Sequence, residues 1–364
     1  MEGQVCRHGF QPLIAAMPSR FTCAGVPEAA IETARSHVAD ILKHAIRLEE
    51  EHATVVVWDS ECDLSVGLAQ AYQRCLPEAT FMHFDRTPHD TILAAFEILE
   101  PGDLVVLIQS TKFKLAAWRI RLELFQRKLK VVEHPHLLRM PGDEALIYID
   151  SLAYDPEYFR GVGSALKSRL EVAQVGVLRS AGEELIFPAG FDTPKLNVGD
   201  YTDMANVGGQ FPIGEVFTES LDLEAVHGRV VIALFGDMDF TVNRPEHPIT
   251  LIVEKGCVVG AENSTPAFDC VLESIHAAEG QIWLRELGLG LNQAFTRSRV
   301  VTDIGSYERV CGVHLSLGAK HSAYNKPQIK KKHARQHVDV FALTDSLSLD
   351  GEEIYRDESW IVGR

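Results

Sequence analysis

The chain has 364 residues, 46% of them apolar, which is enough for two domains with separate hydrophobic cores. It carries 51 acidic and 35 basic residues, a net charge of −16, which excludes a protein that binds nucleic acid over its whole surface. No apolar run approaches the ~20 residues of a membrane-spanning helix, and the first residues, MEGQVCRHGF, lack the pattern of a signal peptide. Seven cysteines without a CxxC pair indicate reduced thiols, so we expect a cytoplasmic protein. The charge and the absence of a long apolar run lead us to expect neither nucleic acid nor a membrane as a partner.

Residues 1–180 alternate between helical and strand-like patterns. The helical segments are 28–51, 65–76, 89–100 and 114–129, and the strand-like segments are 53–59, 80–84, 103–109 and 130–134, followed by an apolar segment at 145–151. This alternation predicts an open, mostly parallel α/β domain. Neither GxGxxG nor GxxxxGK[ST] is present, so we interpret this domain as a scaffold that gates substrate access and not as a nucleotide site.

Residues 181–364 show a different sequence pattern, with short β segments separated by turns that contain Gly, Pro and Asn. The β segments are 184–190, 228–236, 249–261 and 337–343, with a hairpin turn at 254–256 and a helix at 265–280 that Gly280 ends. This half is predicted to be an α+β, mostly antiparallel domain. The fold class is therefore α/β, with an open parallel domain followed by an α+β domain.

His337 and Asp339 lie two residues apart in the last of these β segments. Residues i and i+2 of a strand point to the same side, so both side chains can reach one cation. Two ionisable groups that face a core need a partner, and a divalent metal ion is one such partner. The alternative is an exposed strand face with a simple His–Asp hydrogen bond.

The segment ERVCGVHLSLGAKHSAYN, residues 308–325, contains two more histidines. Val310, Val313 and Leu317 are spaced as one apolar stripe of a helix that Gly318 would end. His314 falls within that stripe. His321 follows the glycine, where the chain can turn back toward the same site.

Two glutamates complete the candidate site. Glu215 follows a Pro/Gly-rich loop at the start of an expected strand, and Glu286 lies between an apolar stretch and two glycines. Such positions let the backbone approach a ligand closely. Two solvated glutamates beside turns are the simpler alternative.

Four ordered blocks carry a resemblance to a known family. They are GGQFPIGEVFTES (208–220), LRELGLGLN (284–292), VCGVHLSLGAKH (310–321) and QHVDVFAL (336–343). Their order and intervals resemble those of the thermophilic-type metallo-aminopeptidases, the aminopeptidase T and S group, over most of 200–345. The resemblance implies a two-metal centre whose ligands here are Glu215, Glu286, His314, His337 and Asp339.

The resemblance departs from this family at one position. The family has a tyrosine seven residues after its first histidine, and this chain has His321 there, with Tyr324 as its nearest tyrosine. His321 is then an additional metal ligand, or Tyr324 takes the catalytic role of the family's tyrosine.

The resemblance implies a hydrolase that releases an N-terminal residue from a small peptide or an amide. Two divalent ions (Zn, Co or Mn) lower the pKa of a bound water, and Glu286 takes its proton and passes it to the leaving amine. A homodimer is expected, because members of this family pair. Arg285, Lys320 and Lys330–Lys332 are candidates to hold a substrate carboxylate.

A second reading is a mononuclear iron oxygenase. The 2,5-dihydroxypyridine 5,6-dioxygenases resemble the same fold and use one Fe(II), and two histidines with one carboxylate suit that ion. Here the triad would be His314, His337 and Asp339, or His321 in place of one of them. A third reading keeps the fold without the metal, as a module that binds a small molecule or a partner protein. The pair of histidines in HPH, 134–136, is a weaker candidate that would reach the site across a domain cleft; the alternative is a loop cap.

Overall fold

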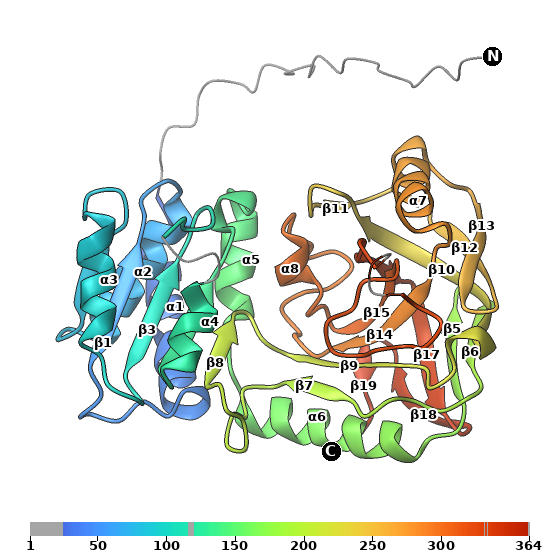
Figure 1. Cartoon of the computed structure of the whole chain (residues 1–364), viewed down its shortest axis with the longest axis horizontal. Coiled ribbons are helices and arrows are strands. Elements are labelled where there is room, and N and C mark those ends of the chain that lie inside the picture. Colours follow the sequence, from blue (N-terminus) through green and yellow to red (C-terminus); the bar gives the residue numbers. More distant parts are fainter. Residues whose placement is uncertain (1–24, 116–119, 331, 333, 363–364) are drawn as a thin grey trace.

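The computed structural model describes residues 25–115, 120–330, 332 and 334–362, and these residues form two sheets side by side (Figure 1). The N-terminal part of the chain surrounds a parallel sheet, and the C-terminal part surrounds a larger antiparallel sheet. The predicted fold class, a parallel α/β part followed by an α+β part, is confirmed.

The parallel sheet has the order β2-β1-β3-β4-β8. Its strands are β1 (Thr54–Trp58), β2 (Thr80–His83), β3 (Leu104–Ile108), β4 (Lys130–His134) and β8 (Gly208–Gln210). The helices between and around them are α1 (Glu28–Asp40), α2 (Asp63–Cys75), α3 (His89–Glu97), α4 (Ile120–Gln126) and α5 (Asp143–Ser151). The predicted alternation of helices and strands is therefore present.

Both faces of this sheet are covered, because the side chains of each strand alternate between two apolar layers. Val56 packs in the same cluster as residues of α1, α2 and α5, such as Leu68. Its neighbours Val55 and Val57 pack in the opposite cluster with α3 and α4 residues, such as Phe96. Continuous apolar strands such as LVVLI of β3 are needed for this double burial.

The antiparallel sheet has the order β19-β18-β17-β5-β6-β10-β16-β15-β14-β9-β7. Its strands are β5 (Gly176–Ser180), β6 (Glu183–Phe187), β7 (Lys195–Asn197), β9 (Glu215–Glu219), β10 (His227–Gly236), β14 (Leu284–Gly290), β15 (Gly312–Leu317), β16 (Val338–Ala342), β17 (Thr344–Leu349), β18 (Glu352–Arg356) and β19 (Ser359–Trp360). Strands β11 (Val242–Asn243), β12 (Ile249–Glu254) and β13 (Cys257–Glu262) extend from β10.

The two sheets exchange strands around the predicted domain boundary at residue 180. Strand β5 precedes the boundary and pairs in the antiparallel sheet, whereas β8 follows it and pairs with β4 in the parallel sheet. Helix α6 (Pro156–Val172) lies below the antiparallel part in Figure 1 and leads from one sheet to the other. The division into 1–180 and 181–364 stays a prediction.

Several predicted boundaries need adjustment. Helix α1 ends at Asp40 and continues as a π-helical turn, Ile41–Ala45, so the helix predicted over 28–51 is shorter. Of the helix predicted over 114–129, residues 120–126 are helical and 116–119 lie outside the described residues. The hairpin at 254–256 and helix α7 (Pro266–Glu279), which ends at Gly280, are confirmed.

The helix predicted over the stripe Val310, Val313 and Leu317 is wrong. Residues 312–317 form strand β15, which pairs with β14 on one side and β16 on the other. All six residues are buried, so apolar spacing could not distinguish a central strand from a buried helix. The correction moves His314 away from the Val313 and Leu317 side of the chain, because alternate residues of a strand face opposite ways.

The described helices include none long and apolar enough to cross a membrane. The cysteines among the described residues are free thiols, in agreement with the prediction of reduced cysteines; they are Cys62, Cys75, Cys257, Cys270 and Cys311.

Candidate metal centre

Four adjacent strands place the predicted ligands on one face of the antiparallel sheet. Across β9, β14, β15 and β16, Glu215 is paired with Gly290, His314 with Gly288, and Asp339 with Ser316. Paired residues of antiparallel strands share a face, so the side chains of Glu215, Glu286, His314 and Asp339 lie above the same surface. The predicted convergence of these residues from distant parts of the sequence is therefore present.

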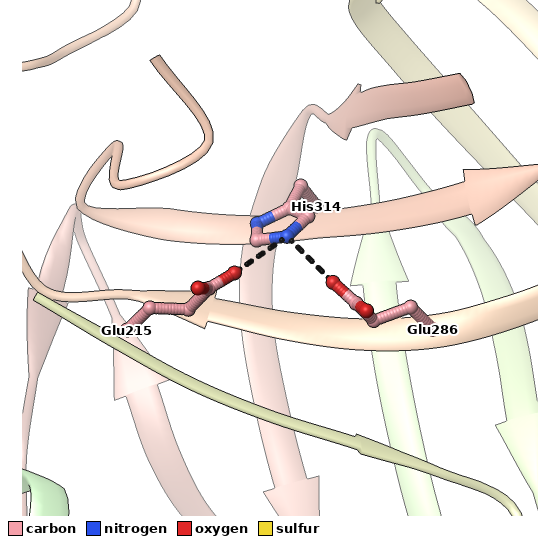
Figure 2. Close-up of side chains that lie close together, drawn as sticks. All are labelled: Glu215, Glu286 and His314. Atoms are coloured by element: carbon pink, nitrogen blue, oxygen red, sulfur yellow. Dashed lines mark hydrogen bonds and ion pairs between the residues drawn. The ribbon is translucent and has the colours of Figure 1, made fainter. Parts of the chain in front are cut away.

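His314 lies between two carboxylates (Figure 2). Its Nε2 atom is 3.3 Å from Glu215 Oε1 and 3.2 Å from Glu286 Oε1. The imidazole is completely buried, and its Nδ1 atom has no hydrogen-bond partner among the described residues. One nitrogen and two carboxylate oxygens thus meet in a region from which water is largely excluded.

Gly288 makes room for this imidazole. A Cβ atom at position 288 would lie 2.0 Å from His314 Nε2 and 2.1 Å from Cε1. The His314 side chain therefore crosses strand β14 directly above Gly288 to reach Glu215 and Glu286. The sequence predicted that the glycines after Glu286 let the backbone approach a bound ligand closely. Gly288 instead leaves room for the side chain of His314, itself a candidate metal ligand.

A second group shares Glu286. The side chains of Glu286, His337 and Asp339 offer one ligand atom each within 4.8 Å of one another, as do those of Glu215, Glu286 and His314. His337 Nε2 is 3.1 Å from Asp339 Oδ1 as an ion pair, yet the geometry is not that of a hydrogen bond, and Oδ1 has no hydrogen-bond partner among the described residues. A buried carboxylate oxygen without a hydrogen-bond donor is costly unless a cation faces it, which is either a protonated His337 or a bound metal ion.

The side chain of His321 also lies beside Glu286. The sequence predicted that the chain could turn back toward the site after Gly318. Its Nε2 atom is 2.5 Å from Glu286 Oε2, and the backbone N–H of Ala323 donates to its Nδ1 atom at 3.1 Å. Because Nδ1 accepts a hydrogen bond, the neutral ring carries its proton on Nε2 and donates it to Glu286. His321 therefore holds one oxygen of Glu286, while His314 faces the other.

Tyr324 is directed elsewhere. Its hydroxyl donates to the backbone carbonyls of Thr193, at 2.8 Å, and Phe217, at 3.1 Å. Its ring centroid lies 5.2 Å from that of His321. A catalytic role for Tyr324 stays a prediction, and it would require the hydroxyl to leave these two carbonyls.

Two buried arginines support the carboxylates: Arg309, which the sequence did not indicate, and Arg285, which was expected to hold a substrate carboxylate. Arg309 lies 3.1 Å from Glu215 Oε2 and also pairs with Glu308. Arg285, which is 2% exposed, binds Glu219 at 2.6 Å. Its guanidinium is thus not free for a substrate carboxylate. Glu219 lies four residues after Glu215 in the same strand, so the sequence alone could have placed both on one face. No pattern in the sequence indicates a role for Arg309.

Burial and mutual contact perturb the pKa values in the site. Burial lowers the pKa of His314, but its contacts with Glu215 and Glu286 outweigh burial and hold it well above the ordinary value. Burial would raise the pKa of Glu286, and hydrogen bonds from His314 and His321 hold it well below its usual range. In this form a proton on His314, together with the guanidinium of Arg309, balances the two carboxylates, and the His314 proton is the charge that a bound cation would replace.

His337 and Glu308, which line a cavity beside the centre, show related effects. Burial lowers the pKa of His337, and the adjacent Asp339 carboxylate raises it above the ordinary value. Burial raises the pKa of Glu308 to about 8. The negative charge of Glu215 raises this pKa further, whereas the positive charge of Arg309 lowers it. The acidic groups of the site are thus neutralised by Arg309 together with His314 and His337, whose pKa values are raised.

The centre opens into a cavity of about 390 Å³. Glu215, Glu286, His321 and His337 line it. The HPH histidines do not reach it directly: His134 is buried between the hydroxyls of Tyr72 and Tyr148, and His136 lies 3.6 Å from the buried carboxylate of Asp303.

The residues present fit a metal centre. Imidazole and carboxylate donors suit Zn²⁺ and other first-row divalent ions. Asp339 Oδ1 has no hydrogen-bond donor, and the two groups of donors lie on adjacent strands, with His337 directly before β16. The identity and the number of the ions do not follow from these donors.

The comparisons with known proteins concern the fold. No protein-family model matches the chain, and no curated protein matches its sequence. Two solved structures are similar over nearly their whole length. The 2,5-dihydroxypyridine dioxygenase of Pseudomonas putida KT2440 has a TM-score of 0.59 and 16% identity, with 91% of this chain and 97% of that chain covered.

Wild-type AmpT from Thermus thermophilus, a metallo-aminopeptidase, has a TM-score of 0.56 and 12% identity, with 91% and 99% covered. Both similar proteins are enzymes. At these identities the likeness shows that the chain shares their fold, and the chemistry has to be argued from its own residues.

Proposed function

We propose that the protein is a metal-dependent hydrolase that cleaves an N-terminal residue or an amide bond at a two-cation centre. The observation that carries this proposal is that Glu286 belongs to both groups of donor atoms. One carboxylate between two sets of ligands is the arrangement of a bridged pair of ions. Glu215 and His314 would hold one cation, and His337 and Asp339 the other.

Two such cations, when bound, lower the pKa of a water molecule and polarise a substrate carbonyl. Glu286 lines the cavity and, if one of its oxygens stays free of metal, would take the proton of that water and pass it to the leaving amine. His321 donates to Glu286 Oε2 and fixes the orientation of this carboxylate. Ligation of a metal by His321 Nε2 would require its proton to move to Nδ1 and would break the bond from Ala323.

The test is elemental analysis of protein purified without added metal, combined with variants of each group. We expect two divalent ions per chain. His314→Ala removes one, Asp339→Asn removes the other, and Glu286→Ala weakens both. Glu273→Gln, an exposed position on α7, is the matched control and keeps both ions. A protein that binds no divalent ion at saturating concentration would refute the proposal.

A second candidate function is a mononuclear Fe(II) dioxygenase. The observation that favours it is the proximity of two imidazoles to one carboxylate: the rings of His321 and His337 are 5.9 Å apart, and His337 adjoins Asp339. Two histidines and a carboxylate suit non-haem iron. This reading predicts one iron per chain, its loss in His321→Ala, and O₂ consumption with an aromatic substrate. The hydrolase reading predicts that His321→Ala retains both ions.

A further inference from the structure

The cavity above the metal centre has two kinds of lining besides the candidate ligands. Phe217 and Phe240 contribute aromatic surface, and Lys320 and Arg335 contribute positive charge. Its volume of about 390 Å³ is in the range of small-molecule sites. These two linings indicate what kind of molecule the site takes.

Phe240 is held in place although its side chain is 58% exposed. It lies in the loop between β10 and β11, with a left-handed φ of 61°. The carboxylate of Asp237 organises this loop by accepting hydrogen bonds from the backbone N–H groups of Asp239, at 2.9 Å, and Thr241, at 3.0 Å. An exposed aromatic ring on an ordered loop beside a cavity is a preorganised apolar contact for a ligand.

The backbone of Phe240 is also tied to neighbouring segments. Its carbonyl oxygen accepts hydrogen bonds from the backbone N–H of Ile304, at 3.3 Å, and from Arg139 of the N-terminal part, at 3.4 Å. Arg139 in turn binds the buried Asp303 carboxylate at 3.1 Å. The aromatic side of the cavity is thus fixed by both parts of the chain. Phe217, in strand β9 between Glu215 and Glu219, adds a second ring, 5.9 Å from that of His321.

The cationic side is fixed by one carboxylate at the end of helix α7. Glu279 Oε1 accepts from the backbone N–H groups of Arg335 and Gln336, both at 2.7 Å, and Oε2 accepts from that of Ala319 at 2.6 Å. The backbone N–H of Lys320 donates to the carbonyl of Gln336 at 2.9 Å. Lys320 and Arg335 therefore start from adjacent, ordered backbone positions.

Neither cationic side chain forms an ion pair or hydrogen bond with any residue that the structure describes. Both are exposed, in a chain whose acidic residues outnumber its basic ones by 51 to 35. Two unpaired cations beside a carboxylate-rich centre suit an anionic group of a ligand, and guanidinium and ammonium groups both bind carboxylates.

We propose that the site takes small substrates that carry a free carboxylate and an apolar or aromatic side group: dipeptides or similar amino-acid conjugates. Lys320 and Arg335 hold the carboxylate, and Phe240 with Phe217 contacts the apolar group. The assignment of the cleaved bond rests on the proposed hydrolase function. The recognition of a carboxylate and a ring rests only on the cavity.

Binding measured by calorimetry tests the recognition directly. The probes are 3-phenylpropanoate and its neutral amide, 3-phenylpropanamide, added to the protein with its bound metal. We expect the carboxylate to bind at least about tenfold more tightly than the amide. The double variant Lys320→Met/Arg335→Met loses this preference, whereas its metal content stays unchanged. Phe240→Ala weakens binding of both probes by a similar factor.

The matched control is Lys330→Met/Lys332→Met. It removes the same charge from nearby exposed lysines that are not in the cavity lining, and it keeps the preference. Equal binding of the two probes by the unmodified protein overturns the proposal. So does a carboxylate preference that survives the Lys320/Arg335 double variant, because the carboxylate would then be bound by the metal alone.

Turnover of Phe-Leu and Phe-Leu-amide separates this inference from the proposed function. Carboxylate-dependent binding without cleavage of either compound supports the substrate class and contradicts the hydrolase. Cleavage of both compounds with equal kcat/KM, without a binding preference, supports the hydrolase and contradicts the substrate class.

Discussion

Gly288→Ala is the change that the structure predicts to damage the metal centre without altering a candidate ligand. The added Cβ would lie 2.0 Å from His314 Nε2, about 1.4 Å short of the 3.4 Å at which ordinary contact begins. His314 is completely buried, so the ring has no open space into which it can move. Overpacking of this kind costs about 1–3 kcal/mol of unfolding free energy.

The effect on function should exceed the effect on stability. A shift of the imidazole by more than 1 Å removes Nε2 from its place between Glu215 and Glu286. Misplacement by 1 Å of a group in an active site can reduce the rate about 100-fold. We therefore expect Gly288→Ala to lose the cation held by Glu215 and His314, and to lose at least about 99% of turnover while remaining folded.

The assay is metal content by mass spectrometry after dialysis, together with urea unfolding monitored by circular dichroism. The control is Gly260→Ala in β13, where the new Cβ would meet Ile252 at an ordinary 3.5 Å. A double variant with His314→Ala adds a second check, since Gly288→Ala should cost little once the ring is absent. Unchanged metal content in Gly288→Ala would show that the imidazole does not cross β14 at this position.

Three further predictions concern charge. Asp339→Asn should abolish turnover and leave the fold intact, as checked by kcat and circular dichroism; retained turnover would contradict the site. Arg285→Met should lower the free energy of unfolding by about 3–5 kcal/mol, because Glu219 would be left buried without its partner, and urea denaturation measures this. Burial lowers the pKa of His134 to about 3, so the unfolded chain binds this proton more tightly than the folded chain. The corresponding stability is fully present above pH 6.5 and is lost by roughly 1.4 kcal/mol per pH unit as the pH falls toward 3. His134→Gln should show a flatter dependence in unfolding titrations, and equal slopes would refute the assignment.

The sequence predicted the parallel part of the fold well because local pattern and tertiary role coincide there. Strands such as LVVLI are apolar throughout since both faces of the sheet are covered, and the helices between them show ordinary amphipathic spacing. The HxD pair was equally accessible to local reasoning. The i, i+2 geometry of a strand suffices to place His337 and Asp339 on one face.

The strand around His314 was not accessible in this way. Six consecutive buried residues have no exposed side to define a period, and only the pairing of β15 with β14 and β16 decides that the segment is extended. The roles of Gly288 and Arg309 also depend on contacts with residues distant in the sequence, His314 and Glu215 respectively.

The sequence by itself thus determined the alternation of helices and strands in the first half and the mostly antiparallel strands of the second half. It also determined the residue types capable of holding a divalent ion. These properties follow from side-chain chemistry and from contacts between near neighbours in the chain. Only the tertiary structure decided that Glu286 is shared by two groups of ligands, that His321 donates to it, and that aromatic and cationic residues line one cavity. The first depends on the register of the strands and the other two on the loops that connect them, and both are determined by contacts between segments tens of residues apart.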